Sequence, residues 1–168
     1  MDKTITTALL IVISIIMAIM LFNIAYPAVI QGGQAITSMA ARAEDQMRSQ
    51  ISIIHAAGEL DADQNWTDSN GSATFDVFAW VKNLGTTRIL GLERIDVFFG
   101  PEGNFTRIPY GSDSGSPYWT YQIENDTQMT PSATVRLTIT YGSPLPAGRY
   151  FLRVTLPNGV TDDTVLGL

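Results

Sequence analysis

The stretch TITTALLIVISIIMAIMLFNIAYPAVI, residues 4–30, decides the fold of this chain. It contains no charged residue, and the first charge after Lys3 is Arg42. As an α-helix rising about 1.5 Å per residue, it spans roughly 40 Å, which is enough to cross a hydrocarbon core of about 30 Å with some tilt. Because it is apolar on all sides rather than on one stripe, either lipid or copies of the same helix must surround it.

A secretory signal peptide is the first alternative for this stretch. Its apolar region would run about 7–15 residues and end in a small-x-small cleavage site. The run here is much longer, and the residues from Pro27 to Val29 do not form such a site. We therefore expect the segment to be retained in the functional protein.

Beyond Gly33 the apolar pattern changes to that of an amphipathic helix. Apolar residues recur at three- and four-residue steps: Ile36, Met39, Ala40, Ala43, Met47, Ile51 and Ile54. Pro27 is expected to kink the helix, and the alternative is that the helix ends at Tyr26. Gly58 is a candidate C-cap. The pattern predicts one helical region over residues 1–58 that is too long for a small core to bury and so needs partners.

Composition limits the classes of function. The 168 residues fit one modest domain beside the helix. The net charge of -6 argues against nucleic-acid binding, which needs a basic surface. The absence of cysteine excludes a disulfide scaffold, a thiolate metal site and a cysteine nucleophile.

After a polar, turn-rich hinge at residues 59–72, the apolar period becomes two over residues 73–168. Phe75, Val77, Ala79 and Val81 share one face of the first expected strand. The expected strands are Ala73–Asn83, Arg88–Leu92, Arg94–Phe99, Phe105–Tyr110, Tyr118–Ile123, Ala133–Tyr141, Arg149–Leu156 and Val160–Leu166. The prediction is an α+β fold, a long N-terminal helix followed by an antiparallel, immunoglobulin-like β-sandwich.

No constellation of residues predicts catalysis or a cofactor, so we expect no enzyme activity. His55 is the single histidine and falls in the predicted helix, without the partners that catalysis or zinc binding needs. Asp61, Asp63 and Asn65 match the opening of a calcium loop, but Trp66 replaces the required glycine and Ser72 replaces the bidentate glutamate. A solvated hinge is the favoured interpretation of this weak metal motif.

Four sequences match the N-x-[ST] glycosylation sequon. They begin at Asn65, Asn70, Asn104 and Asn125, all in the expected hinge or loops. The alternative is that these are turn residues that match by chance. If the sites are used, they place the domain outside the cell.

Two short motifs carry a family resemblance. FAWVKNLG at residues 78–85, followed by IDVFF at 95–99, is similar to the V-K-N-x-G strand–turn and next strand of archaellins and archaellum stator proteins. The whole architecture resembles an archaellin or a related archaeal type IV pilin-like protein. Two departures stand out: no short basic leader precedes the apolar helix, and Ile5 stands where bacterial type IV pilins carry glutamate.

The resemblance implies a structural subunit of an extracellular, archaellum-like helical filament for motility. Its partners would be other copies of itself, the membrane before assembly, and the secretion and assembly machinery. The residues expected to form the polymerising helix are Leu10, Ile13, Met17, Leu21, Ile36, Ala40, Ala43, Met47 and Ile51. The alternative is a membrane-anchored archaellum stator or accessory protein, or an adhesive pilin. The amphipathic segment 34–57 favours bundle packing over a simple anchor.

Overall fold

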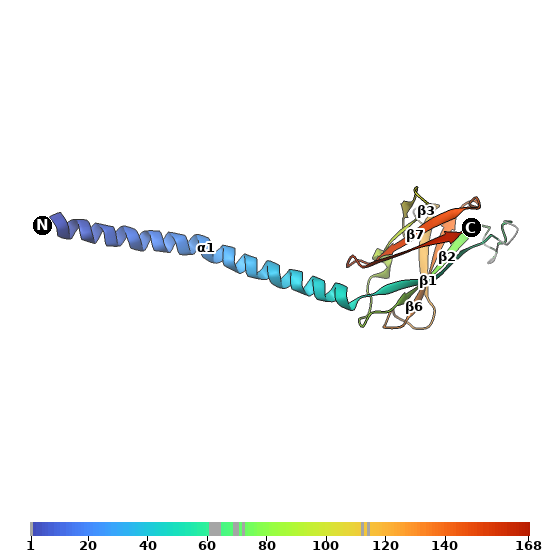
Figure 1. The fold of residues 1–168 in the computed structure, drawn as a ribbon, viewed down its shortest axis with the longest axis horizontal. Coiled ribbons are helices and arrows are strands. Elements are labelled where there is room, and N and C mark those ends of the chain that lie inside the picture. The colour runs from blue at the N-terminus through green and yellow to red at the C-terminus, as the bar shows by residue number, and fades with distance from the viewer. Residues whose placement is uncertain (1, 61–64, 69–70, 72, 112, 114) are drawn as a thin grey trace. The chain divides into compact units, whose positions relative to one another are not determined.

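The computed structural model describes residues 2–60, 65–68, 71, 73–111, 113 and 115–168. The chain divides into two units, Met1–Ala43 and Glu44–Leu168. The first unit is helical, and the second contains the end of that helix and all the strands (Figure 1).

Helix α1 runs without interruption over Asp2–Arg48 and passes through Pro27, so the alternative of a helix ending at Tyr26 is wrong. Polar side chains within it bond to carbonyls of the preceding turn: Thr7 Oγ1 donates to Lys3 O at 2.8 Å, and Ser14 Oγ donates to Leu10 O at 2.8 Å. Such bonds satisfy hydroxyl groups where no water is present.

The prediction that the helix continues to residue 57 is wrong. Ile51–Gly58 is strand β1, which pairs antiparallel with β2, Phe75–Asn83. The register shifts between Ile53 and His55, and this irregularity breaks the alternation by which a strand is recognised. Ile51 therefore belongs to the core of the sandwich, where it is 5% exposed, and not to the polymerising helix.

Two four-stranded antiparallel sheets form the second unit. The first has the order β1-β2-β6-β5 and the second β4-β3-β7-β8. The remaining strands are β3 Asp96–Pro101, β4 Thr106–Ile108, β5 Tyr118–Ile123, β6 Thr134–Tyr141, β7 Arg149–Thr155 and β8 Thr161–Gly167. The predicted α+β fold with an antiparallel β-sandwich is confirmed. The expected strand at Arg88–Leu92 is instead a single bridge, between Ile89 and Met129, followed by the 3-10 turn η1, Leu92–Arg94.

The core lies between the sheets and is built from the faces that the period-two pattern predicts. Phe75, Val77, Ala79 and Val81 of the central strand β2 are all buried. Buried residues of the neighbouring strand β6 lie beside them, and buried residues of β3 and β7 in the second sheet complete the core: Val135, Leu137, Ile139, Val97, Phe99, Leu152 and Val154. Burial of these side chains is the main source of the stability of the sandwich.

Tyr141, at the end of β6, makes the sandwich sensitive to alkali. Burial, with a smaller effect of Tyr150, raises the pKa of Tyr141 to about 12 from an ordinary value of 10.0. The stabilising effect of the neutral phenol is complete below pH 10 and is lost as the pH rises through 12. We expect Tyr141→Phe to reduce the alkaline loss of stability by about 1 kcal/mol, since the group is only partly buried. Thermal unfolding across this pH range, with tyrosinate absorbance as the titration signal, checks it.

Candidate functional site

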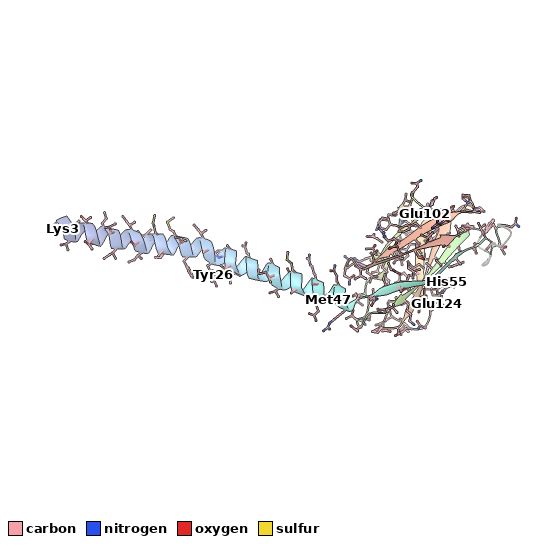
Figure 2. All side chains as sticks on the ribbon, viewed as in Figure 1. Lys3, Tyr26, Met47, His55, Glu102 and Glu124 are labelled. Atoms are coloured by element: carbon pink, nitrogen blue, oxygen red, sulfur yellow. The ribbon has the colours of Figure 1, made fainter. Side chains whose placement is uncertain are left out.

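Helix α1 presents apolar side chains on all its sides (Figure 2). By length and composition, α1 is able to cross a membrane. The residues of α1 that were predicted to polymerise, from Leu10 to Met47, are all exposed within the chain. The side chain of Met47 is 80% exposed. Only lipid or another protein chain can cover such a surface in water.

Some residues of the predicted metal and glycosylation sites lie within the described part of the chain, and others lie outside it. Asp61, Asp63 and Asn70 lie outside, whereas Asn65 is described and exposed. Within the described residues no group of three or more acidic, histidine or cysteine side chains could hold a metal ion. His55 lies in β1, and its ring lies tilted against that of Trp80, with 5.3 Å between the ring centroids.

The last turn of α1 is attached to the sandwich by the turn between β7 and β8. Gln46 Nε2 donates to the carbonyl oxygen of Asn158 at 2.7 Å. The Asn158 side-chain amide donates to Asp45 Oδ2 at 3.1 Å and to Ser49 Oγ at 2.9 Å. Two polar side chains of the last helical turn and that of Ser49, just beyond it, therefore meet one residue of a loop more than a hundred positions later in the sequence.

The segment between α1 and β1 is held from the other side by the V-K-N-x-G motif. The backbone N–H groups of Leu84 and Gly85 both donate to Gln50 O, at 2.8 and 3.0 Å. Thr86 N donates to Arg48 O at 2.9 Å. Helix ends leave carbonyls without intrahelical partners, and this loop satisfies that of Arg48, the last residue of α1.

Asn83 fixes that loop from inside the protein. It is fully buried, and its Nδ2 donates to the carbonyls of Thr87, Met129 and Thr130 at 2.9, 3.1 and 3.1 Å. Its Oδ1 accepts from Gly85 N at 2.9 Å. One asparagine thus joins the end of β2, the loop that receives the helix and the loop before β6.

Gly85 is required because the chain approaches it closely. A Cβ at this position would clash with the carbonyl oxygen of Arg48 and lie 2.7 Å from Gln50 N, both backbone atoms. We expect Gly85→Ala to lower the free energy of unfolding by about 2–4 kcal/mol, since the backbone cannot yield as a side chain does. The matched control is Gly142→Ala, whose Cβ would meet only Ser116 at ordinary contact distance. Chemical denaturation of the two variants checks this, and equal stabilities would contradict it.

The residues 44–50, 83–86 and 158 together form what we call the helix socket. Sequence reasoning did not identify this site. One part of the socket, the V-K-N-x-G motif, was recognised in the sequence as a family feature. Nothing in the sequence indicated that this motif contacts Arg48 and Gln50. Its donors and acceptors are used in holding the end of a helix, which is a structural and not a catalytic arrangement.

The class that the fold defines is a β-sandwich preceded by a long helix that is apolar enough to cross a membrane. No family model matches the chain. It is similar to the archaellum periplasmic stator protein FlaG from Sulfolobus acidocaldarius, with 29% identity and a TM-score of 0.55, over 70% of this chain and 99% of that one. It is also similar to a chain in the archaellum periplasmic stator protein complex FlaF and FlaG from the same organism, with 30% identity and a TM-score of 0.54. That match covers 70% of this chain and 88% of the other.

A curated relative extends the likeness over almost the full chain. An uncharacterised protein of Archaeoglobus fulgidus is 24% identical over 163 residues, which cover 94% of this chain and 93% of the relative. Since the identity to the stator complex reaches 30% with most of that chain covered, the protein belongs to the archaellum-associated family of these stator proteins. The predicted association with the archaellum is confirmed at this level, and the comparisons favour the stator alternative over the filament subunit.

Proposed function

We propose that this chain is a membrane-anchored stator or accessory protein of an archaellum. The apolar part of α1 holds it in the cytoplasmic membrane, and the sandwich contacts other proteins on the outer side. The observation that carries this proposal is the likeness to the stator protein, which spans nearly all of that protein's chain.

The division of α1 supports an anchor. Residues 4–30 suffice to cross a bilayer, and the remaining helix to Arg48 adds roughly 27 Å of more polar helix. The case for a filament core rested on an amphipathic helix extending to residue 57. Because residues 51–58 are instead a strand, the part of α1 available for bundle packing is shorter than that argument requires.

The test compares where the protein is found with what its loss does. We expect the full chain to remain with the membranes when the filaments are sheared from the cells that make it. Cells without it should still make filaments but swim poorly. If the chain is instead the main subunit of the sheared filaments, the proposal is wrong and the chain is a filament subunit.

Glycosylation belongs to the same proposal, because the sandwich would face the outside. Asn104 lies in the exposed turn between β3 and β4, and its side chain makes no hydrogen bond among the described residues. In contrast, Asn125 Oδ1 accepts from Thr134 N at 2.7 Å, and its Nδ2 is directed to Ser132 O at 3.5 Å. The Asn104 side chain can therefore enter the active site of a transferase freely, whereas the Asn125 side chain must first give up these contacts.

We therefore expect a glycan on Asn104 and none on Asn125. Mass spectrometry of peptides from the native protein reads this directly. Thr106→Ala destroys the first sequon and should remove the modification, whereas Thr127→Ala, in the second sequon, should change no peptide mass beyond the substitution itself. A modified Asn125 would contradict the prediction.

A further inference from the structure

A row of planar side chains crosses the outer face of the first sheet. The ring of His55 on β1 lies tilted against that of Trp80 on β2, with 5.3 Å between centroids, and the Trp80 and Phe78 ring centroids are 6.2 Å apart. The guanidinium of Arg136, on β6, lies over the ring of Phe78 at 5.9 Å. Phe78, Trp80 and Arg136 alternate with the buried core residues of their strands, so they lie on the side away from the core. His55 is exposed and pairs with Trp80 in the register of β1 and β2. We call this set, with Lys82, the aromatic face.

The aromatic face carries one cation, Lys82, that the described carboxylates do not compensate, on a protein that is acidic overall. The chain has a net charge of -6, but the only carboxylate in strands β1, β2, β5 and β6 is Asp76. That residue is 2% exposed, and Thr140 Oγ1 donates to it at 2.7 Å. Lys82 has no ion-pair partner in the described part of the chain, while Arg136 meets Glu124, just beyond β5, at 3.2 Å.

The outer face of the second sheet also carries aromatic rings, but its charges are compensated within the chain. Arg153 lies over the ring of Phe151 at 5.1 Å. Each arginine of this sheet has a carboxylate: Arg107 with Asp96 at 2.6 Å, Arg149 with Glu102 at 3.2 Å and Arg153 with Asp163 at 3.9 Å. The first sheet therefore retains an unmatched cation beside its rings, and the second does not.

We propose that the aromatic face docks a second protein through a segment that places an apolar side chain over Trp80 and carboxylates near Lys82 and Arg136. Aromatic residues and arginine are the usual anchors of protein interfaces, and charge complementarity selects the partner. The inference rests on the proposed function only in that the partner is taken to be another archaellum component.

A second copy of the same face is disfavoured as the occupant. A second copy of the aromatic face would offer Lys82 only the carboxylate of Glu124, which Arg136 already holds at 3.2 Å, so the cation of each copy would stay uncompensated. Like charges brought together across an interface cost binding energy. The partner must therefore present acidic groups that this face lacks.

Photo-cross-linking of the full-length chain in its own cells tests the proposal. The photoreactive residue replaces Thr138, which pairs with Phe78 in the register of β2 and β6. The control replaces Val165, which is 42% exposed on β8 of the other sheet. We expect one protein to be captured from the first position and not from the second, and its cross-linked peptide to contain aspartate or glutamate.

A charge substitution then tests the role of Lys82. Lys82→Glu should lower the cross-linking yield at least about tenfold, whereas Lys82→Arg should keep it. The matched control is Arg149→Glu on the second sheet, which should leave the yield unchanged, and circular dichroism checks that each variant is folded. The proposal is overturned by no cross-link from Thr138, by equal yields from Val165, by capture of only lipid, glycan or a second copy, or by insensitivity to Lys82→Glu.

The outcomes also separate this proposal from the proposed function. If an acidic partner is captured but it is no archaellum component, and cells lacking the chain swim normally, the docking face stands and the stator function fails. If those cells swim poorly but Thr138 captures nothing, the function stands and the docking face fails.

Discussion

Replacement of Asn83 by alanine is expected to lower the free energy of unfolding by about 3–5 kcal/mol. The side chain is fully buried, its two Nδ2 hydrogens are shared among three carbonyls, and its Oδ1 accepts from Gly85 N. Alanine removes these bonds, although Gly85 N, Met129 O and Thr130 O keep second partners in Gln50 O, Ile89 N and Ala133 N. Each lost bond therefore costs about 0.5–1.5 kcal/mol, and the loss of packing at this buried site adds to that cost. Part of the cost is recovered where loops relax toward water, which is why the total is less than the sum.

The effect should be seen at the helix socket as well as in global stability. Asn83 holds the loop whose N–H groups bind Arg48 O and Gln50 O, so its loss frees the start of β1. We expect faster amide hydrogen exchange at Leu84, Gly85 and Thr86 than in the wild type. Denaturant unfolding of the full chain in mild detergent, followed by tryptophan fluorescence, gives the global value.

Asn158→Ala is the matched control, because it removes another asparagine of the same socket. Its amide bonds to Asp45 and Ser49, at the surface or partly buried, where water replaces the lost partner. We expect a cost of about 1 kcal/mol or less. If Asn83→Ala were no more costly than Asn158→Ala, the buried asparagine would not be what fixes the loop.

Most of the sandwich could be predicted because its strands are amphipathic. Strand β5 occupies the predicted residues Tyr118–Ile123, and β6 and β7 begin or end within one residue of the prediction. A face that must be buried gives a period of two in the sequence, and this signal depends only on the strand itself. It therefore survives without any knowledge of which strands pair.

Strand β1 could not be predicted because it lacks this period of two. Its apolar residues continue the spacing of the preceding helix, and the irregularity between Ile53 and His55 removes the period of two. Its conformation is decided by pairing with β2, in which Ile51 meets Asn83. A partner so distant along the chain leaves no mark in the local sequence.

The hinge shows a second limit. Residues 59–72 were expected to be solvated because they are polar, yet Glu59 is 6% exposed. Its carboxylate accepts from Asp76 N at 3.0 Å and from Trp66 Nε1 at 3.4 Å. Composition predicts exposure only on average, and a carboxylate that finds buried donors is the exception. Asp61 and Asp63, on which the metal prediction depended, lie outside the described residues.

Two carboxylates in the middle of the apolar run are expected to release the protein from the membrane. Ile15 and Ile19 lie one turn apart near the centre of residues 4–30, and both are exposed within the chain. Aspartate at the centre of a membrane-spanning helix costs roughly 2.5–3.5 kcal/mol on the insertion scale. The pair Ile15→Asp and Ile19→Asp should therefore cost about 6 kcal/mol, which lowers the inserted fraction about 10⁴-fold at equilibrium. Alkaline extraction of membranes measures the fraction retained.

The informative control is the same pair of changes beyond the apolar run, Ile36→Asp and Ala40→Asp. Both positions are exposed on α1 and have the same spacing of one turn. If α1 is an anchor, this variant stays in the membrane, since residues 4–30 are untouched and its carboxylates reach water. If α1 is the core of a helical bundle, Ile36 and Ala40 are buried between chains, and two unpaired charges there abolish assembly. The stator proposal requires that the variant with Ile36→Asp and Ala40→Asp stays membrane-bound and functional, while the variant with Ile15→Asp and Ile19→Asp is released. Loss of function in both variants would show that the second half of the helix is packed against a partner.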